Sequence, residues 1–184
     1  MKEISLHILD LAQNAITAGA RHICIDVEES SAEDLLTVRI ADDGCGMSAE
    51  QALRVQDPFV TSRSTRKVGL GIPMFREGCL QCGGAFRLNS QPGQGTTLEG
   101  SYRLGHIDRQ PLGDLAATVF LLVSANPELD FCLNHSVDGR KFEFSTEDIR
   151  TVLGDVPLDL PEVAQWIKDC LLEGENDLHG GSQT

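Results

Sequence analysis

Long hydrophobic runs are missing from this chain of 184 residues. No apolar stretch approaches the roughly 20 residues that a helix needs to span a bilayer, and Met1-Lys2-Glu3 does not open a signal peptide. Positive charge is scarce as well, because 15 Lys and Arg stand against 28 Asp and Glu, a formal net charge of −13. Nucleic acids and anionic membranes are bound by clustered Lys and Arg, so neither is expected as a partner. We expect a cytoplasmic protein.

The acidic charge is concentrated in the second part of the chain. Residues 1–104 carry 10 Lys and Arg against 13 Asp and Glu, whereas residues 105–184 carry 5 against 15. A polyanion bound by the near-neutral first part would therefore be held by backbone amides and a few cations. The length suits one domain, or one domain with a substantial extension.

A second pair of cysteines at metal-ligand spacing is also absent. The six cysteines are scattered, and Cys79-x-x-Cys82 is the only close pair. Scattered cysteines in a cytosolic protein predict reduced thiols. We interpret Cys79 and Cys82 as small apolar side chains at a helix end, with a redox or iron–sulfur role as the alternative.

The periodicity of the apolar residues predicts an α+β protein. Helices are expected over 4–18, 48–56 and 71–81, and strands over 22–28, 35–41, 86–88 and 97–104. Beyond residue 104 the pattern predicts a helix over 111–124, strands over 130–136 and 141–145 that turn at Asp138-Gly139, and helices over 146–153 and 161–172.

Asp10 and Asn14 stand four residues apart in the first predicted helix, so their side chains share one face. Both residue types are unfavourable inside a helix, which suggests that they contact a ligand. The alternative is that both face solvent. Gly19 follows at a position where a glycine commonly ends a helix.

Asp42 ends the second predicted strand and is followed by glycines at 44 and 46. A rigid strand can aim one carboxylate into a pocket, and the glycines let a flat ligand approach the backbone. The same Asp-x-Gly-x-Gly pattern also occurs in ordinary loops.

Gly69-Leu70-Gly71 leads into the third predicted helix, in which Pro73 takes a first-turn position where its missing N–H does no harm. Unpaired backbone N–H groups and the helix dipole at such a start favour an anion such as phosphate. Directly before it, residues 61–67 are rich in Thr, Ser and Arg. Their cations, Arg63, Arg66 and Lys67, either contact phosphates or are simply solvated.

Four stretches in a fixed order, residues 6–15, 40–47, 61–73 and 92–97, carry a family resemblance. Together they resemble the N box and the three glycine boxes of the GHKL ATPase superfamily, which comprises gyrase, Hsp90, histidine-kinase catalytic domains and the mismatch-repair MutL proteins. The resemblance covers residues 1–104. It implies a Bergerat-type ATP-binding sandwich, in which a mixed sheet has helices on one face, with ATP and Mg²⁺ as cofactors.

The resemblance also implies roles for single residues. Asn14 matches the asparagine that coordinates the nucleotide-bound Mg²⁺. Asp10 stands where hydrolysing members carry a water-activating glutamate, which is one methylene longer. Asp42 matches the aspartate that accepts a hydrogen bond from the adenine amino group. The other implied nucleotide contacts are Gly44, Gly46, Met47 and Thr96 near the base, Thr61, Ser62, Arg63 and Lys67 in the ATP lid, and the main chain of Gly69, Leu70 and Gly71 at the phosphates.

Three segments are predicted: an ATP-binding domain over residues 1–104, an extension over 105–173 and a disordered tail over 174–184. The extension has no long paired heptads and no phosphoacceptor histidine, so we expect it to pack beside the ATP domain and to bind a protein partner. Two functions fit. One is an ATPase or a protein kinase, histidine-kinase-like or of the anti-sigma serine type, with Asp10 as catalytic residue. The other is a non-catalytic module that reports ATP or ADP through its extension. Homodimerisation is left open.

Overall fold

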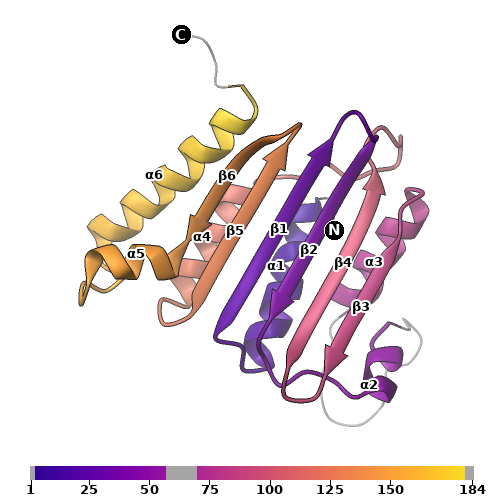
Figure 1. Cartoon of the computed structure of the whole chain (residues 1–184), viewed down its shortest axis with the longest axis horizontal. Coiled ribbons are helices and arrows are strands. Elements are labelled where there is room, and N and C mark those ends of the chain that lie inside the picture. Colours follow the sequence, from indigo (N-terminus) through magenta and orange to yellow (C-terminus); the bar gives the residue numbers. More distant parts are fainter. Residues whose placement is uncertain (1–2, 57–69, 181–184) are drawn as a thin grey trace.

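The computed structural model describes residues 3–56 and 70–180. Within these ranges six helices and six strands form an α+β fold in which the strands follow one another in pairs (Figure 1). In chain order they are α1 (Ile4–Thr17), β1 (His22–Ser30), β2 (Leu35–Asp42), α2 (Ala49–Arg54), α3 (Gly71–Gln81), β3 (Phe86–Gln91), β4 (Gly95–Arg103), α4 (Leu115–Ala125), β5 (Asp130–Val137), β6 (Arg140–Ser145), α5 (Thr146–Leu153) and α6 (Pro161–Leu178).

The strands form one mixed sheet in the order β3-β4-β2-β1-β5-β6. Neighbouring strands are antiparallel except β1 and β5, which are parallel and pair from His22↔Asp130 to Glu29↔Val137. The sheet therefore runs without a break across residue 104. The division of the chain into an ATP-binding domain and an extension stays a prediction, but the extension completes the sheet rather than packing beside it.

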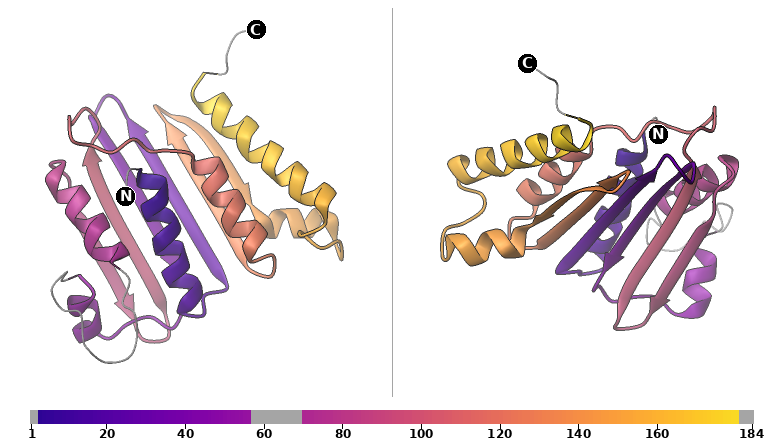
Figure 2. Two further views of the ribbon diagram at one scale, coloured as in Figure 1. Left: turned by 180° about the vertical axis from the view of Figure 1, so that it is seen from behind. Right: turned by 45° about the horizontal axis from the view of Figure 1, so that its top comes forward.

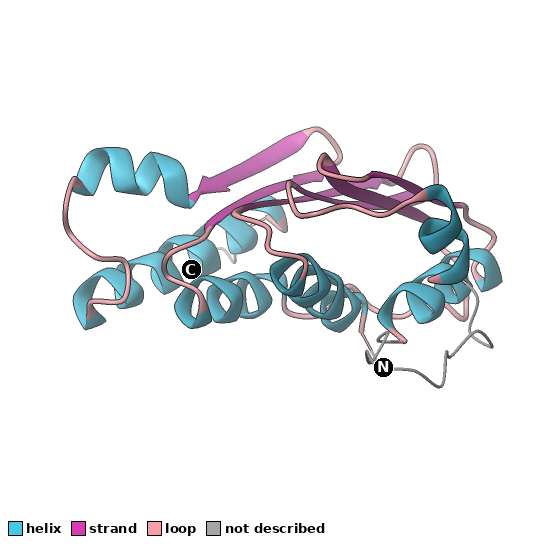
Figure 3. Cartoon of the chain, turned by 90° about the horizontal axis from the view of Figure 1, so that it is seen from below, coloured by secondary structure: helices cyan, strands magenta, loops and turns pink. Residues whose placement is uncertain are grey.

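The described helices α1, α3, α4 and α6 cover one face of the sheet, as Figures 2 and 3 show. Alternation along the strands explains this arrangement, because the inward side chains of β1 and β2 are apolar and buried. The core between the layers includes Ile8 and Leu11 of α1, Phe75 of α3, and Val119 of α4. No helix in the described part of the chain is long and apolar enough to cross a membrane.

The local signals of the sequence are confirmed in several places. Gly19 has a φ of 78°, and the backbone N–H groups of Gly19 and Ala20 donate to the carbonyl oxygens of Ile16 and Ala15, which closes the end of α1. Asp138 and Gly139 both have positive φ, at 48° and 85°, as a two-residue hairpin turn requires.

The sequence-based prediction is wrong for the start of α4 and for the end of α6. Helix α4 begins at Leu115 rather than at residue 111, because Asp114 caps it and the carbonyls of Pro111 and Leu112 instead accept hydrogen bonds from the first backbone N–H groups of α1. Helix α6 continues to Leu178, so the prediction of a disordered tail is wrong for residues 174–178. Leu178 is buried there, which stabilises the last turns.

The prediction of reduced thiols is wrong for Cys24 and Cys132, which form a disulfide. The two residues are direct partners in the parallel register of β1 and β5, a contact across 108 residues of sequence. Cys79 and Cys82 are buried free thiols at the end of α3, as predicted. Burial raises the pKa of Cys79 to about 12, which makes it unreactive near neutral pH.

Candidate nucleotide site

Asp10 and Asn14 lie on α1 beside the start of α3. A Cβ atom built on Gly71, the first residue of α3, would lie 3.3 Å from the Asp10 Cβ and 3.6 Å from the Asn14 Nδ2. The side chain of Asn14 makes no hydrogen bond to a described residue, and the Asp10 side chain is exposed. The absence of a Cβ at Gly71 thus lets the first turn of α3 approach two polar side chains that share one face of α1.

The first turn of α3 is open to an anion. No side chain among the described residues caps this helix, Leu70 occupies the N-cap position, and Pro73 adds no N–H. Leu70 and Gly71 thus lie at a helix start, and the backbone N–H groups of Gly71 and Ile72 donate to no described residue. The other predicted phosphate contacts, Thr61, Ser62, Arg63, Lys67 and Gly69, lie outside the described residues.

Asp42 ends β2 and is partly buried. Its Oδ1 accepts a hydrogen bond of 2.9 Å from the backbone N–H of Gly44, which fixes the carboxylate relative to the turn. Burial raises the pKa of the Asp42 carboxyl, whereas backbone hydrogen bonds from Gly44 and Thr96 act in the opposite direction. The neighbouring Asp43, for which the sequence predicted no role, holds the start of β1 by accepting hydrogen bonds from the backbone N–H groups of Arg21 and His22.

The turn at Gly46 packs tightly against the loop between β3 and β4. Gly46 has a φ of 64°, and a Cβ there would collide with the carbonyl oxygen of Gln91. Gly95 has a φ of 86°, and a Cβ there would collide with the carbonyl oxygen of Asp42. Close backbone approach, rather than contact with a ligand alone, explains both glycines.

Ser90 is a residue that sequence reasoning missed. Its Oγ accepts a hydrogen bond of 2.8 Å from the backbone N–H of Met47, lies 2.9 Å from the Thr96 Oγ1 and donates to the carbonyl oxygen of Gly95. One hydroxyl therefore joins two predicted site residues that are 49 positions apart in sequence. No local signal marks a serine in an exposed edge strand, so only the pairing of β3 with β4 could have identified it.

A pocket of about 280 Å³ brings most of these groups together. Near the lower end of the usual range for small-molecule sites, its size suits a nucleotide base or part of a nucleotide. Five sequence-predicted residues line it: Asn14, Asp42, Gly46, Met47 and Thr96. Asp10, Gly44, Leu70 and Gly71 do not line it, although Gly44 lies against Asp42 and Gly71 lies against Asp10 and Asn14. The apolar wall of the pocket includes Leu11, Val55, Ile72 and Leu98.

Comparison with models of known protein families identifies the family of this chain. The model described as "Histidine kinase-, DNA gyrase B-, and HSP90-like ATPase" matches residues 2–106, more than half of the chain. The chain belongs to this GHKL ATPase family. GHKL membership implies ATP binding, and the resemblance noted in the four sequence stretches is confirmed.

Individual GHKL relatives are similar over parts of their length. The Non-motile and phage-resistance protein of Caulobacter vibrioides is 29% identical over 119 residues, which are 60% of this chain and 14% of that protein. The DNA mismatch repair protein MutL of Anaeromyxobacter dehalogenans is 37% identical over 101 residues, 50% of this chain and 16% of that protein. The sensor histidine kinase ZraS of Escherichia coli is 31% identical over 91 residues, 50% of this chain and 19% of that protein. The chain thus spans less than a fifth of each of these relatives.

Solved structures agree with the GHKL fold. The Aquifex aeolicus MutL ATPase domain complexed with ADP matches with a TM-score of 0.51 and 12% identity, covering 100% of this chain and 99% of that one. The N-terminal domain of a DNA repair protein matches with a TM-score of 0.52 and 14% identity, covering 84% of this chain and 58% of that one. At such low identity the likeness concerns the fold alone.

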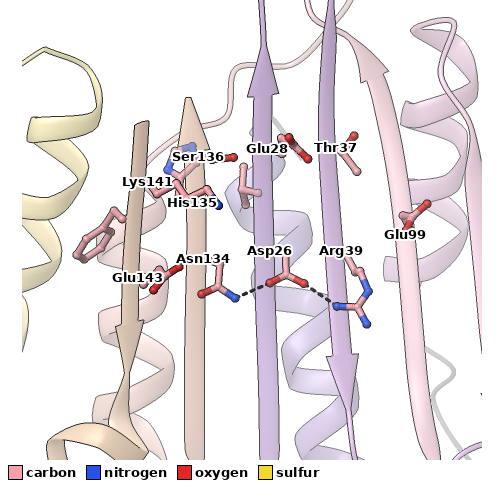
Figure 4. Close-up of a pocket in the computed structure, with 12 residues that line it drawn as sticks. Asp26, Glu28, Thr37, Arg39, Glu99, Asn134, His135, Ser136, Lys141 and Glu143 are labelled. Carbon is pink, nitrogen blue, oxygen red and sulfur yellow. Dashed lines mark hydrogen bonds and ion pairs between the residues drawn. The ribbon is translucent and has the colours of Figure 1, made fainter. Parts of the chain in front are cut away.

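A second hollow, of about 270 Å³, lies away from the GHKL nucleotide residues, on the sheet face that no described helix covers (Figure 4). Across three neighbouring strands, Asp26 accepts hydrogen bonds of 2.7 Å from both Arg39 and Asn134. Arg39, Asp26 and Asn134 thus pair their polar groups with one another across the strands. These cross-strand pairs stabilise the sheet and indicate no ligand.

Proposed function

We propose that this GHKL domain binds ATP with Mg²⁺ and either hydrolyses it or transfers its phosphate to a separate protein partner. The observation that carries the proposal is the convergence of Asp10, Asn14 and the start of α3 at Gly71, next to the pocket that contains Asp42. Each of these groups suits one part of the nucleotide. The carboxylate of Asp42 accepts a hydrogen bond from the adenine amino group, and the first turn of α3 binds phosphate.

The residues at the phosphate end fit a magnesium ion. Asn14 offers a side-chain oxygen without a described partner, and oxygen ligands are what Mg²⁺ prefers. Bound Mg²⁺ neutralises charge on the phosphate oxygens. Thr61, Ser62, Arg63, Lys67 and Gly69 remain proposed lid and phosphate contacts, and Gly44, Gly46, Met47 and Thr96 remain proposed contacts near the base.

Asp10 is the proposed general base. Aspartate reaches less far than the glutamate of hydrolysing relatives, and the close approach at Gly71 offsets part of that loss. With no Cβ on Gly71, the start of α3, and so a phosphate bound there, lies near the Asp10 carboxylate. The carboxylate can then accept the proton of an attacking water or of a partner's hydroxyl group.

Incubation with γ-labelled ATP and Mg²⁺ tests this function when free phosphate and protein-bound label are followed together, with a binding isotherm as control. Binding with release of phosphate supports an ATPase. Transfer of label to a second protein supports a kinase. Binding with neither, in the presence of candidate partners, favours the non-catalytic ATP/ADP-responsive module, and no binding at all contradicts both.

We also propose that the partner docks on the extension. A groove of about 490 Å³ between α5 and α6 is almost entirely apolar, and its rim exposes 85% of Val152 and 52% of Trp166. Deleting residues 105–184 would not test this, because the loss of β5 would open an edge along β1. The paired substitution Val152→Lys and Trp166→Ala should leave ATP binding intact while abolishing phosphotransfer to the partner, or its response to ATP.

A further inference from the structure

A cluster around one buried histidine lies at the other end of the sheet from the nucleotide site. Asp42 pairs with Ile23 near the start of β1, whereas Glu29 lies six residues further along the same strand, about 20 Å away. There the side chain of His135, on β5, is fully buried between two carboxylates. Its Nδ1 lies 2.9 Å from both oxygens of Glu175 on α6, and its Nε2 lies 3.3 Å from Glu29 Oε1.

A second imidazole completes the cluster. His179 follows the last turn of α6, is exposed, and stacks edge-on against His135 with ring centroids 5.9 Å apart. One ligand atom each from Glu29, His135 and His179 can be chosen so that all lie within 4.8 Å of one another. Glu29 on β1 and His135 on β5, which are 106 positions apart in sequence, thus meet His179 at the end of α6, and two imidazoles and a carboxylate lie close together.

We propose that Glu29, His135 and His179 bind one divalent transition-metal ion of the zinc class. Zinc ligands at about 2.0–2.2 Å from a tetrahedral ion are about 3.3–3.5 Å apart, which is the spacing already present between His135 Nε2 and Glu29. His179 closes the site by a rotation of its exposed side chain. Two imidazoles favour zinc-class ions over Mg²⁺ or Ca²⁺, which prefer oxygen ligands.

Glu175 acts as a positioning residue in this site. A histidine that ligates through Nε2 must carry its proton on Nδ1, and a carboxylate facing Nδ1 stabilises that tautomer. Both oxygens of Glu175 are placed for this contact. The charges also balance, because a divalent ion neutralises the two carboxylates of Glu29 and Glu175.

Burial lowers the pKa of His135, but hydrogen bonds to Glu175 and Glu29 outweigh burial and raise it to about 9. Metal binding releases the Nε2 proton of a protonated His135 to solvent, whereas the Nδ1 proton stays on the ring and is donated to the Glu175 carboxylate. The bound ion joins β1 and β5 to the end of α6, and it does so independently of the proposed ATP chemistry.

Calorimetric titration of the full, chelator-treated chain with Zn²⁺ tests the site, with Co²⁺ absorption as a second readout of tetrahedral geometry. We expect one Zn²⁺ per chain. His179→Ala should weaken binding by at least 10–100-fold, and Glu175→Gln by about 10–100-fold. The control His22→Ala removes an exposed histidine at the far end of β1, and Asn14→Ala alters the proposed magnesium site, so neither should change Zn²⁺ affinity.

Equal Zn²⁺ affinity in the wild type and His179→Ala would overturn the proposal, as would an equal loss in the control His22→Ala. Absence of a tetrahedral Co²⁺ spectrum in the wild type would overturn it as well. Because His179 is exposed, the variant should fold, which circular dichroism checks. If His179→Ala does not fold, His179→Gln, which keeps a polar side chain, replaces it in the comparison.

Discussion

Gly71 leaves room for Asp10: a Cβ on the first residue of α3 would stand 3.3 Å from the Asp10 Cβ, closer than most side chains pack. Gly71→Ala should therefore push α3 away from α1 and lower ATP affinity and turnover by about 10-fold or more, equivalent to about 1.4 kcal/mol. Calorimetric binding and phosphate release measure the two effects.

Gly78→Ala is the matched control for this change. A Cβ at Gly78, in the middle of the same helix, would meet the Tyr102 ring at an ordinary 3.7 Å. Because alanine favours helix interiors, this variant should gain up to about 1 kcal/mol of stability without altering ATP binding. An equal loss of binding in both variants would contradict the account of Gly71.

Asp42→Asn should abolish ATP binding and yet stabilise the protein near neutral pH. The pKa of Asp42 is raised from 3.8 by burial, so its ionisation in the folded protein costs stability. That cost is absent below the unfolded pKa of 3.8, and it grows as pH rises through the folded pKa. The gain in melting temperature should therefore be present at neutral pH and vanish in acid.

Thermal melts of both proteins across this pH range, with ATP titrations at neutral pH, check the prediction. A stability difference that is independent of pH would show that Asp42 ionisation is not its cause. Retained ATP affinity in Asp42→Asn would remove this residue from the site.

Asn14→Ala should make ATP binding insensitive to magnesium. We expect the ATP affinity of the wild type to fall roughly 10-fold when a chelator removes Mg²⁺. The variant should show this reduced affinity both with and without Mg²⁺. Isotherms with and without chelator measure this. Gln13→Ala, an exposed neighbour on α1, should keep the full magnesium effect.

Ser90→Ala should loosen the wall of the nucleotide pocket. The substitution leaves the Met47 N–H and the Thr96 hydroxyl without the Ser90 oxygen, which should cost about 1–3 kcal/mol of unfolding free energy and weaken ATP binding. Urea denaturation measures the first effect and calorimetry the second. Asn89→Ala, at an exposed position of the same strand, should change stability by less than about 0.5 kcal/mol.

Local features of the fold could be predicted from the sequence because local physics determines them. The helical period of α1, the turn at Asp138-Gly139 and the start of the short helix α2 after Ser48 each depend on a few neighbouring residues. The grouping of Asp10, Asn14 and Asp42 came from the order of family motifs, and the structure places all three around one pocket or beside it.

Features that depend on strand pairing could not be predicted. The parallel register of β1 and β5 produces the Cys24–Cys132 disulfide and brings Glu29 near His135, yet neither segment carries a local sign of it. The length of α6 was missed for a similar reason. Its polar end is held by Leu178 and by Glu175, whose partner His135 lies 40 residues earlier.

The most direct test of the central claim compares the wild type with Asp10→Asn in γ-labelled ATP and Mg²⁺. Both should bind ATP with similar affinity, whereas phosphate release or transfer should fall by about 10²–10⁴-fold in the variant, as expected for loss of a general base. Asp169→Asn, an exposed helix carboxylate on α6, should behave as the wild type. Turnover that persists unchanged in Asp10→Asn would contradict the account.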